Sequence, residues 1–224
     1  MSPLLEIQDL HKSFVSPEGE RTTIIHVSHF EMQAGEQIAL QGRSGSGKTT
    51  LLNLIAGILQ ADAGAIMLEG REISALSESD RDRMRGQNIG YIFQTFNLMS
   101  GYTALENVEL AMRFGRGLRR IFAKELLERA GLRDRMHYRP AQLSVGQQQR
   151  VAVARALANH PKLVLADEPT GNLDAHHAAQ ALLLIQEICR ENNAALLLVS
   201  HDPAIHQHCA RVQQLADLNR VKYS

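Results

Sequence analysis

The sequence predicts an α/β fold in which a mostly parallel sheet is interrupted by an α-helical insertion. Two apolar runs, residues 162–167 and 194–202, each end in polar residues, as buried central strands of a parallel sheet do. The stretch between them, 176–192, is long enough for the helix that connects two parallel strands. A third apolar strand at 36–42 runs into a glycine-rich turn followed by a helical pattern.

The other elements follow from periodicity along the chain. Residues 4–14 alternate apolar and polar side chains, which predicts a half-exposed strand of an N-terminal antiparallel β region. The helix after the glycine-rich turn is expected to place five apolar residues on one face: Leu51, Leu52, Ile55, Ile58 and Leu59. From about Arg81 to Asn159 the pattern is mainly helical, over 102–114, over 121–132 and after Ser144.

The whole chain has 224 residues and a formal net charge of zero, typical of one globular domain with an inserted subdomain. No global field attracts nucleic acid or anionic lipid, and no nucleic-acid partner is expected. Two local basic runs, 81–85 and 116–120, are interpreted as solvated faces, with a lipid or RNA patch as the alternative.

The cysteines and the N-terminus favour a reducing, cytoplasmic compartment. Cys189 and Cys209 lack metal-type spacing and indicate no disulfide framework. Residues 1–10 lack the basic and long apolar stretches of a signal peptide, and the apolar run at 194–199 is too short to span a bilayer. If the protein works at a membrane, a partner must carry it there.

Residues 42–49, GRSGSGKT, match the P-loop pattern G-x-x-x-x-G-K-[ST] between a strand and a helix. The glycines let successive N–H groups curl around phosphate oxygens, and the helix N-terminus adds partial positive charge. Lys48 is placed to reach the β- and γ-phosphates, and the Thr49 hydroxyl to bind Mg²⁺. The predicted nucleotide-binding residues here are Gly42, Arg43, Ser44, Gly45, Ser46, Gly47, Lys48, Thr49 and Thr50.

Two adjacent carboxylates, Asp167 and Glu168, end the apolar strand at 163–167, where ligands bind in open α/β sheets. Asp167 suits the Mg²⁺ shell, and Glu168 suits orienting or deprotonating an attacking water. The alternative is that one acid caps the next element while the other is solvated.

Other polar residues near strand ends give weaker signals. His201 ends the strand at 194–202, where a donor is able to stabilise charge in phosphoryl transfer, although a polar strand terminus explains it equally well. Gln94 follows a strand-like segment, from which its amide would reach Mg²⁺ or its water. His206 and His208 form an H-x-H pattern that is interpreted as surface.

The stretch LSVGQQQR at 143–150 contains a helix start. Ser144, followed three residues later by Gln147, fits a capping box. A helix start also attracts anions, and Gly146 leaves backbone exposed for close approach. The sequence therefore predicts a cap and leaves open whose phosphate it faces.

In their order and spacing these motifs resemble the nucleotide-binding domain of ATP-binding cassette (ABC) proteins over essentially the whole chain. GRSGSGKT looks like Walker A, LVLADE like Walker B, and GNLD at 171–174 like the D-loop. LSVGQ looks like the family signature, usually written LSGGQ. Gln94 is similar to the Q-loop glutamine, His201 to the switch histidine, and Phe14 to the aromatic residue that stacks on adenine.

The resemblance implies a P-loop NTPase (RecA-like) core in a single domain. Residues 1–94 and 160–224 would form the catalytic core, and about 95–159 the helical signature subdomain. ATP and Mg²⁺ are the implied ligands. The metal would be contacted by Thr49, Gln94 and Asp167. The implied catalytic residues are Glu168, His201, Gln94 and Lys48.

The resemblance also implies a second ATPase subunit, as a homodimer. Ser144, Gly146 and Gln147 would contact the ATP that the P-loop of the second subunit holds. One departure is Val145, which occupies the first of the two usual signature glycines. Valine is bulkier and β-branched, so the closeness of approach or the hydrolysis rate is open in either direction.

FNLMSGYTALENVELAM and LADEPTGNLD resemble the macrolide-exporter and lipoprotein-releasing branch (MacB-like and LolD-like), which includes FtsE. This implies an ATPase on the cytoplasmic face of the inner membrane that powers an integral membrane permease contacted through Thr95 to Tyr102. Phe96, Leu98 and Met99, with Tyr102, would be apolar anchors there or, equally, core residues. The alternatives are an ATPase that regulates an envelope enzyme through a membrane partner, as FtsE-like proteins do, and a soluble ABC assembly ATPase.

Overall fold

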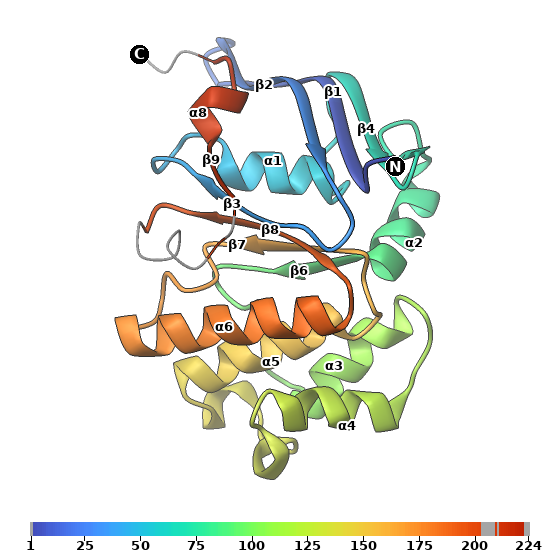
Figure 1. Ribbon diagram of the computed structural model, residues 1–224, viewed down its shortest axis with the longest axis vertical. Coiled ribbons are helices and arrows are strands. Elements are labelled where there is room, and N and C mark those ends of the chain that lie inside the picture. Colours follow the sequence, from blue (N-terminus) through green and yellow to red (C-terminus); the bar gives the residue numbers. More distant parts are fainter. Residues whose placement is uncertain (1, 203–208, 210, 222–224) are drawn as a thin grey trace.

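The computed structural model describes residues 2–202, 209 and 211–221, which form two sheets and the helices around them (Figure 1). The strands are β1 Leu5–Val15, β2 Arg21–Met32, β3 Gln37–Gln41, β4 Ala63–Leu68, β5 Arg71–Glu72, β6 Ile89–Ile92, β7 Leu163–Asp167, β8 Ala195–Ser200 and β9 Arg211–Gln214. The helices are α1 Lys48–Ile55, α2 Glu78–Asn88, α3 Ala104–Arg113, α4 Arg120–Arg129, α5 Val145–Leu157, α6 Ala175–Glu191 and α8 Leu215–Leu218, with 3₁₀ turns at Arg133–Arg135 and Pro140–Gln142.

The central sheet is parallel throughout, in the order β6-β7-β8-β3-β9. Its register places Gln41 beside Ser200, and Asp167 beside Val199. The carboxyl ends of β3, β7 and β8 therefore meet at one edge, where open α/β folds bind ligands. The parallel strands predicted at 36–42, 162–167 and 194–202 are confirmed.

The second sheet, of order β2-β1-β4-β5, is antiparallel and lies beyond α1 in Figure 1. On β1, Leu5, Ile7 and Leu10 are buried while the residues between them are partly or fully exposed. This alternation is the one that predicted a half-exposed strand, and the N-terminal antiparallel region is confirmed.

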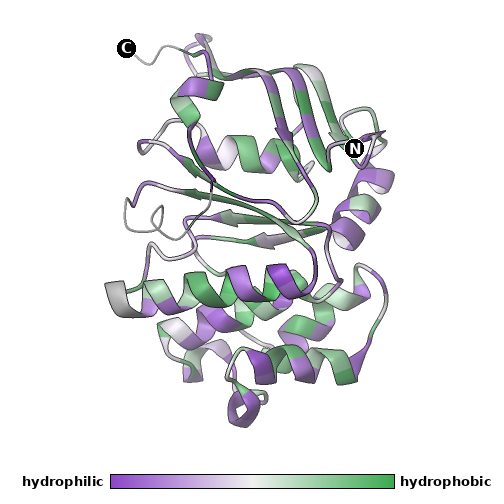
Figure 2. Ribbon diagram, in the orientation of Figure 1, coloured by the Kyte–Doolittle hydropathy of each residue, from purple (hydrophilic) through white to green (hydrophobic). Residues whose placement is uncertain are grey.

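Strand β8 divides the core because successive side chains point to opposite faces of the sheet. Leu196 and Leu198 pack with the cluster of α3 to α6, whereas Leu197 and Val199 pack with α1 and the antiparallel sheet. Hydrophobic residues accordingly run along the central strands and the helices beneath them in Figure 2. Both faces of the parallel sheet are covered, as its continuous apolar strands require.

Two predictions for α1 are wrong. The helix ends at Ile55 with Ala56 as its C-cap, so Ile58 and Leu59 are not on its apolar face. Gly57 has φ +66°, a left-handed conformation that stops the helix. Ile58 is 46% exposed as a result.

The helical insertion follows the sequence more closely. Helices α3, α4 and α5 fall within 95–159, and α6 provides the predicted connection between β7 and β8. Helix α3 begins at a full capping box in which Thr103 and Glu106 satisfy each other's backbone N–H groups. These helices lie together below the parallel sheet in Figure 1.

Candidate active site

The P-loop leads from β3 into α1 through glycines with unusual backbone conformations. Gly47 is the N-cap of α1 with φ +89°, and a Cβ atom there would lie 2.9 Å from Cδ1 of Ile25. Gly45 also has a positive φ, +78°. Glycine adopts this region without steric cost, so the loop can turn its N–H groups inward. Since Gly47 offers no side-chain cap, the first N–H groups of α1 are left for an anion.

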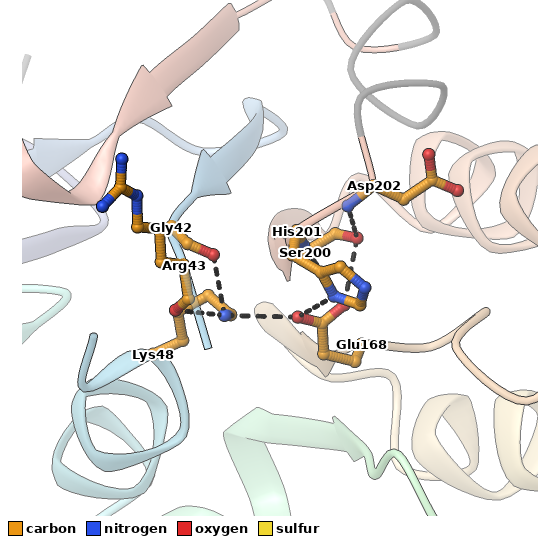
Figure 3. Close-up of polar contacts among 7 residues, drawn as sticks. All are labelled: Gly42, Arg43, Lys48, Glu168, Ser200, His201 and Asp202. Atoms are coloured by element: carbon orange, nitrogen blue, oxygen red, sulfur yellow. Dashed lines mark hydrogen bonds and ion pairs between the residues drawn. The ribbon is translucent and has the colours of Figure 1, made fainter. Parts of the chain in front are cut away.

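Lys48, the first residue of α1, holds this loop together. Its side chain is buried, and Nζ donates to the carbonyl oxygens of Gly42 at 2.8 Å and Arg43 at 2.9 Å. The same ammonium lies 3.3 Å from Oε1 of Glu168, as Figure 3 shows. Lys48 therefore joins the P-loop to the end of β7.

Glu168 is fixed by groups from the end of β8. Its Oε2 accepts hydrogen bonds from Ser200 Oγ at 3.0 Å and from the His201 backbone N–H at 3.3 Å. Its Oε1 lies 2.9 Å from Nδ1 of His201 (Figure 3). Glu168 also has φ +44°, a left-handed conformation that costs a non-glycine residue energy and is concentrated at functional sites. The carboxylate is thus held in one position beside Lys48.

Asp167, the last residue of β7, is buried, and burial raises the pKa of its carboxyl, with the charge of Glu168 adding to the effect. The Thr49 hydroxyl bonds to it and opposes that shift. Oδ1 of Asp167 has no hydrogen-bond partner among the described residues. A buried carboxylate oxygen without a partner, next to a hydroxyl, fits the oxygen ligands that Mg²⁺ prefers.

These groups surround a cavity of about 430 Å³. The residues that line it are Ile24, Ser44, Gly45, Gly47, Lys48, Thr49, Thr50, Gln94, Glu168 and His201. All but Ile24 are among the predicted site residues. Ile24 was missed because it lies on β2, far from any motif, and has only an apolar side chain to signal it.

The remaining predicted P-loop residues lie on the other side of the loop. Gly42, Arg43 and Ser46 line a second cavity of about 540 Å³, which they share with Ser44 and Gly45. Its far wall comes from α8 and the residues after it, including Asn219. The loop therefore separates two hollows, and only the first contains Glu168 and His201.

Gln94 is positioned by a residue that the sequence analysis did not single out. Asn172 Nδ2 donates to the Gln94 carbonyl oxygen at 2.7 Å. A Cβ atom on Gly171 would lie 3.8 Å from Nε2 of Gln94, so the two segments are in contact. An asparagine in GNLD was the available signal, since its amide can bond to backbone in a tight turn.

The signature segment is separate from both cavities. The capping box is confirmed: Gln147 N donates to Ser144 Oγ at 3.3 Å, and Ser144 N donates to Gln147 Oε1 at 3.0 Å. Ser144 is exposed, and neither it, Gly146 nor Gln147 is among the described residues that line the cavities. A Cβ atom on Gly146 would lie 3.7 Å from Cδ2 of His177, at the start of α6.

Three further predicted features are placed as follows. Phe14 lies on β1, 43% exposed, with Lys12 Nζ 5.7 Å from its ring centroid, and outside the lining of the 430 Å³ cavity. His206 and His208 lie outside the described residues. Within the described part of the chain, no cluster of three or more metal-ligating side chains occurs, and Cys189 and Cys209 are unpaired.

A parallel sheet with a P-loop, a Lys48–Glu168 contact and a histidine at the adjacent strand end defines a P-loop ATPase. A family model described as "ABC transporter" matches residues 25–171. The chain therefore belongs to the ABC transporter family, as an ATP-hydrolysing cassette that resembles those of the LolD and MacB type.

Curated relatives and solved structures agree with this assignment. The lipoprotein-releasing system ATP-binding protein LolD 2 of Rhodospirillum rubrum is 44% identical over 220 residues, which is 96% of this chain and 94% of the relative. The macrolide export ATP-binding/permease protein MacB of Escherichia coli O157:H7 is 38% identical, over 97% of this chain and 34% of the relative. A dimeric post-hydrolysis structure of the ATP-binding cassette MJ0796 with ADP and Pi superposes with a TM-score of 0.86 and 34% identity, over 94% of this chain and 93% of that one.

Among the described residues, none of the helices is both long enough and apolar enough to cross a bilayer. The longest, α6, has 17 residues.

Proposed function

We propose that this cassette pairs head to tail with a second copy, hydrolyses Mg·ATP in two shared sites and powers a permease of the LolD or MacB type. The observation that supports the proposal is that the P-loop site and the signature helix lie apart in a single chain. The P-loop, Glu168 and His201 share one cavity, whereas the exposed Ser144 cap lies elsewhere. A second chain is needed to bring a signature helix to that cavity.

In each site, Glu168 is the group that takes a proton from the attacking water. Its two oxygens are held by Ser200 and His201, so they are already oriented when water approaches. Lys48 binds phosphate oxygens and balances their charge, while His201 and Gln94 contact the reacting phosphate and water. Asp167 and Thr49, with Gln94, would hold Mg²⁺, which supplies charge neutralisation at the phosphates.

Ser144, Gly146 and Gln147 act on the nucleotide of the partner cassette. The start of α5 presents N–H groups and a partial positive charge to solvent. Closing the dimer would replace that solvent with phosphate oxygens. Phe14, exposed on β1 between β2 and β4, is assigned to the adenine ring.

The loop Thr95 to Tyr102 is assigned to the permease, and the signature helix holds it directly. Arg155 of α5 donates through Nη2 to the Phe96 carbonyl at 2.7 Å and through Nη1 to the Asn97 carbonyl at 2.5 Å. Both residues have positive φ, +58° and +48°, which is uncommon for non-glycine residues, and the Arg155 bonds help to hold this bend. Movement of α5 during dimer closure would therefore reach the permease loop. Met99 and Tyr102 are exposed for contact, at 51% and 44%.

Leu98 has a different environment from its neighbours in this loop. It packs against the core cluster of the helices, so the core interpretation holds for this residue. The permease contact would place the cassette on the cytoplasmic face of the inner membrane, attached through its partner.

Glu168→Gln is the variant that tests the proposal. The neutral amide keeps the shape of the carboxylate but cannot accept a proton, so hydrolysis should slow by roughly 10²–10⁴-fold while ATP still binds. With Mg·ATP the variant should accumulate as a dimer, measured by light scattering. Glu187→Gln, an exposed change on α6, should hydrolyse ATP normally. A Glu168→Gln chain that hydrolyses ATP at the normal rate would refute the assignment.

The same variant identifies the permease. Affinity capture with Mg·ATP from detergent-solubilised membranes should recover an integral membrane protein, identified by mass. Adding Met99→Ser and Tyr102→Ser to this chain should abolish that recovery, whereas the same two changes in the wild-type chain should leave ATP hydrolysis intact. Recovery of the cassette without any membrane protein would favour a soluble assembly ATPase.

A further inference from the structure

The connection between α3 and α4 exposes large apolar side chains. Phe114 is 75% exposed and Ile121 77%, the highest values for large apolar residues in the described part of the chain, and Leu118 is 43% exposed. All three lie within residues 113–124, which we name the α3–α4 surface. It forms an outer edge of the molecule beside α2, on the right in Figure 1. Figure 2 shows that it contains both hydrophobic and hydrophilic residues.

The same segment is strongly basic. It contains five basic residues and no acidic one: Arg113, Arg116, Arg119, Arg120 and Lys124. Glu109 neutralises Arg120, at 3.0 Å. Among the described residues, Arg113, Arg119 and Lys124 form no ion pair with a carboxylate. In a chain of zero net charge this is a local positive surface, not a general one.

The backbone of the turn is held firmly from beneath. The buried side chain of Asn159 bonds to this backbone twice. Its Oδ1 accepts from Arg116 N at 3.1 Å, and its Nδ2 donates to Ala111 O at 2.8 Å. A Cβ atom on Gly86 of α2 would lie 2.4 Å from the Phe114 carbonyl oxygen, so only glycine allows this approach. The apolar side chains are therefore displayed by a fixed turn and not by a loose one.

We propose that the α3–α4 surface binds an anionic lipid bilayer directly. Apolar side chains that enter the acyl boundary, beside arginines that meet lipid phosphates, are the two parts of an interfacial membrane site. A merely solvated basic face does not need Phe114 and Ile121, whereas large apolar side chains gathered in one exposed segment are typical of an interaction site. RNA binding to a basic surface uses exposed rings for stacking, and here two of the three apolar groups are aliphatic.

The position of this surface suits a cassette that works beside a permease. Helix α3 begins two residues after the loop Thr95 to Tyr102 and ends at Arg113. Ten helical residues span about 15 Å, so the α3–α4 surface lies roughly that far from the loop assigned to the permease. Lipid contact would add a second attachment and limit tilting of the cassette. It goes beyond the proposed permease contact and does not require it.

The test uses the purified full chain and vesicles, with no permease present. Vesicles of phosphatidylcholine with about 30% phosphatidylglycerol should sediment the chain, and binding should fall sharply from about 0.05 to about 0.5 M salt. Phosphatidylcholine vesicles alone should sediment much less. Replacing Arg113, Arg119 and Lys124 with glutamine should weaken binding by about fivefold per charge, the equivalent of about 1 kcal/mol each.

A second variant tests the apolar part. Phe114→Ser with Ile121→Ser should weaken binding at least about tenfold and leave more of the remaining binding sensitive to salt. Its matched control is Val15→Ser with Leu183→Ser, which removes apolar groups that are 68% and 53% exposed elsewhere. Normal ATP hydrolysis by each variant verifies that it is folded.

The charge variant has its own matched control. Arg71, Arg83 and Arg133 are exposed arginines outside the surface, and changing all three to glutamine alters the net charge equally. Equal losses in test and control variants would overturn the proposal, as would wild-type binding no stronger to anionic than to neutral vesicles. So would surface variants that keep vesicle binding but lose the permease in detergent, because the surface would then take a protein. A negative vesicle result leaves the ATPase and permease assignments standing.

Discussion

Helices α1 and α5 both begin at motifs suited to phosphate, yet their first turns are built in opposite ways. Helix α1 begins after Gly47, whose φ of +89° and missing side chain leave its first N–H groups uncapped. Helix α5 begins after Ser144, which forms a full capping box with Gln147. The first start belongs to the 430 Å³ cavity, whereas the second is exposed and has no part in it.

The difference shows how one chain can carry two halves of a shared site. An uncapped start is costly unless an anion fills it, so α1 is prepared for a ligand held within its own chain. A capped start is stable by itself, so α5 can remain in solvent until another molecule approaches. The comparison therefore predicts that changes at α1 alter ATP binding in the single chain, while changes at α5 act only on the pair.

Lys48→Ala should have the largest effect. The variant loses the buried ammonium that we assign to the phosphates, and charge-assisted hydrogen bonds contribute about 1.5–3 kcal/mol each, so ATP affinity should fall at least about 100-fold. Isothermal titration of the monomeric chain measures it. Lys162→Ala, which removes a surface lysine 3.1 Å from Glu69, should bind ATP normally. Unchanged affinity in Lys48→Ala would remove the basis for the P-loop assignment.

Ser144→Arg should have the next largest effect, and it should act on the pair of cassettes and not on the single chain. A long cation at the exposed cap should block close approach of the second cassette, lowering ATP hydrolysis at least about tenfold by preventing assembly of the shared site. ATP affinity of the single chain should not change. Ser77→Arg is the matched control, because Ser77 caps α2 and accepts from Asp80 N at 3.2 Å. Both variants lose about 1 kcal/mol of cap stability, but only the first should lose hydrolysis. Equal hydrolysis in the two would contradict action across a dimer.

Asp167→Asn should have a smaller effect, which is on stability. Unlike most substitutions, it should make the fold more stable. Burial raises the pKa of Asp167, which means that the fold disfavours its charged form at neutral pH. The neutral isostere should therefore raise Tm, which moves by about 2–4 °C for each 1 kcal/mol in a chain of this size. Hydrolysis should fall, because the Mg²⁺ site proposed above would lose a carboxylate ligand. Calorimetry without nucleotide or Mg²⁺ checks the sign, and a lower Tm would show that Lys48 and Thr49 outweigh the cost of burial.

The fold was readable from the sequence where one physical signal acted alone. Continuous apolar runs fixed β7 and β8, because only strands covered on both faces tolerate them. The end of α1 was misjudged because apolar spacing continued through Ile58 and Leu59, whereas backbone conformation at Gly57 ended the helix. Apolar spacing indicates which side chains share a helix face, whereas the backbone conformation of a single residue decides where the helix ends.

The candidate site was predictable to the extent that its residues bear chemistry within motifs. Lys48 and Glu168 came from local patterns, but their 3.3 Å contact depends on strand order, which no local pattern contains. Arg155, which holds the loop at Phe96, was not singled out because an arginine inside an amphipathic helix has no distinguishing sequence signal. Gln149 on the same helix also has no distinguishing sequence signal. It is fully buried, and neither of its amide atoms forms a hydrogen bond within the described residues.

Val145→Gly should give the smallest effect and the sharpest test of the comparison. Val145 is the first residue of α5, 47% exposed, and replacing it with the family's usual glycine removes side-chain bulk beside Ser144. Glycine is less favourable than valine in a helix by less than about 0.5 kcal/mol, so Tm should fall only slightly. ATP affinity of the single chain should stay the same, because this start does not line its cavity. Any change in dimer affinity, of either sign, would then measure how closely valine lets the second cassette approach. Weaker ATP binding by the monomer would instead mean that α5 contributes to the site of its own chain.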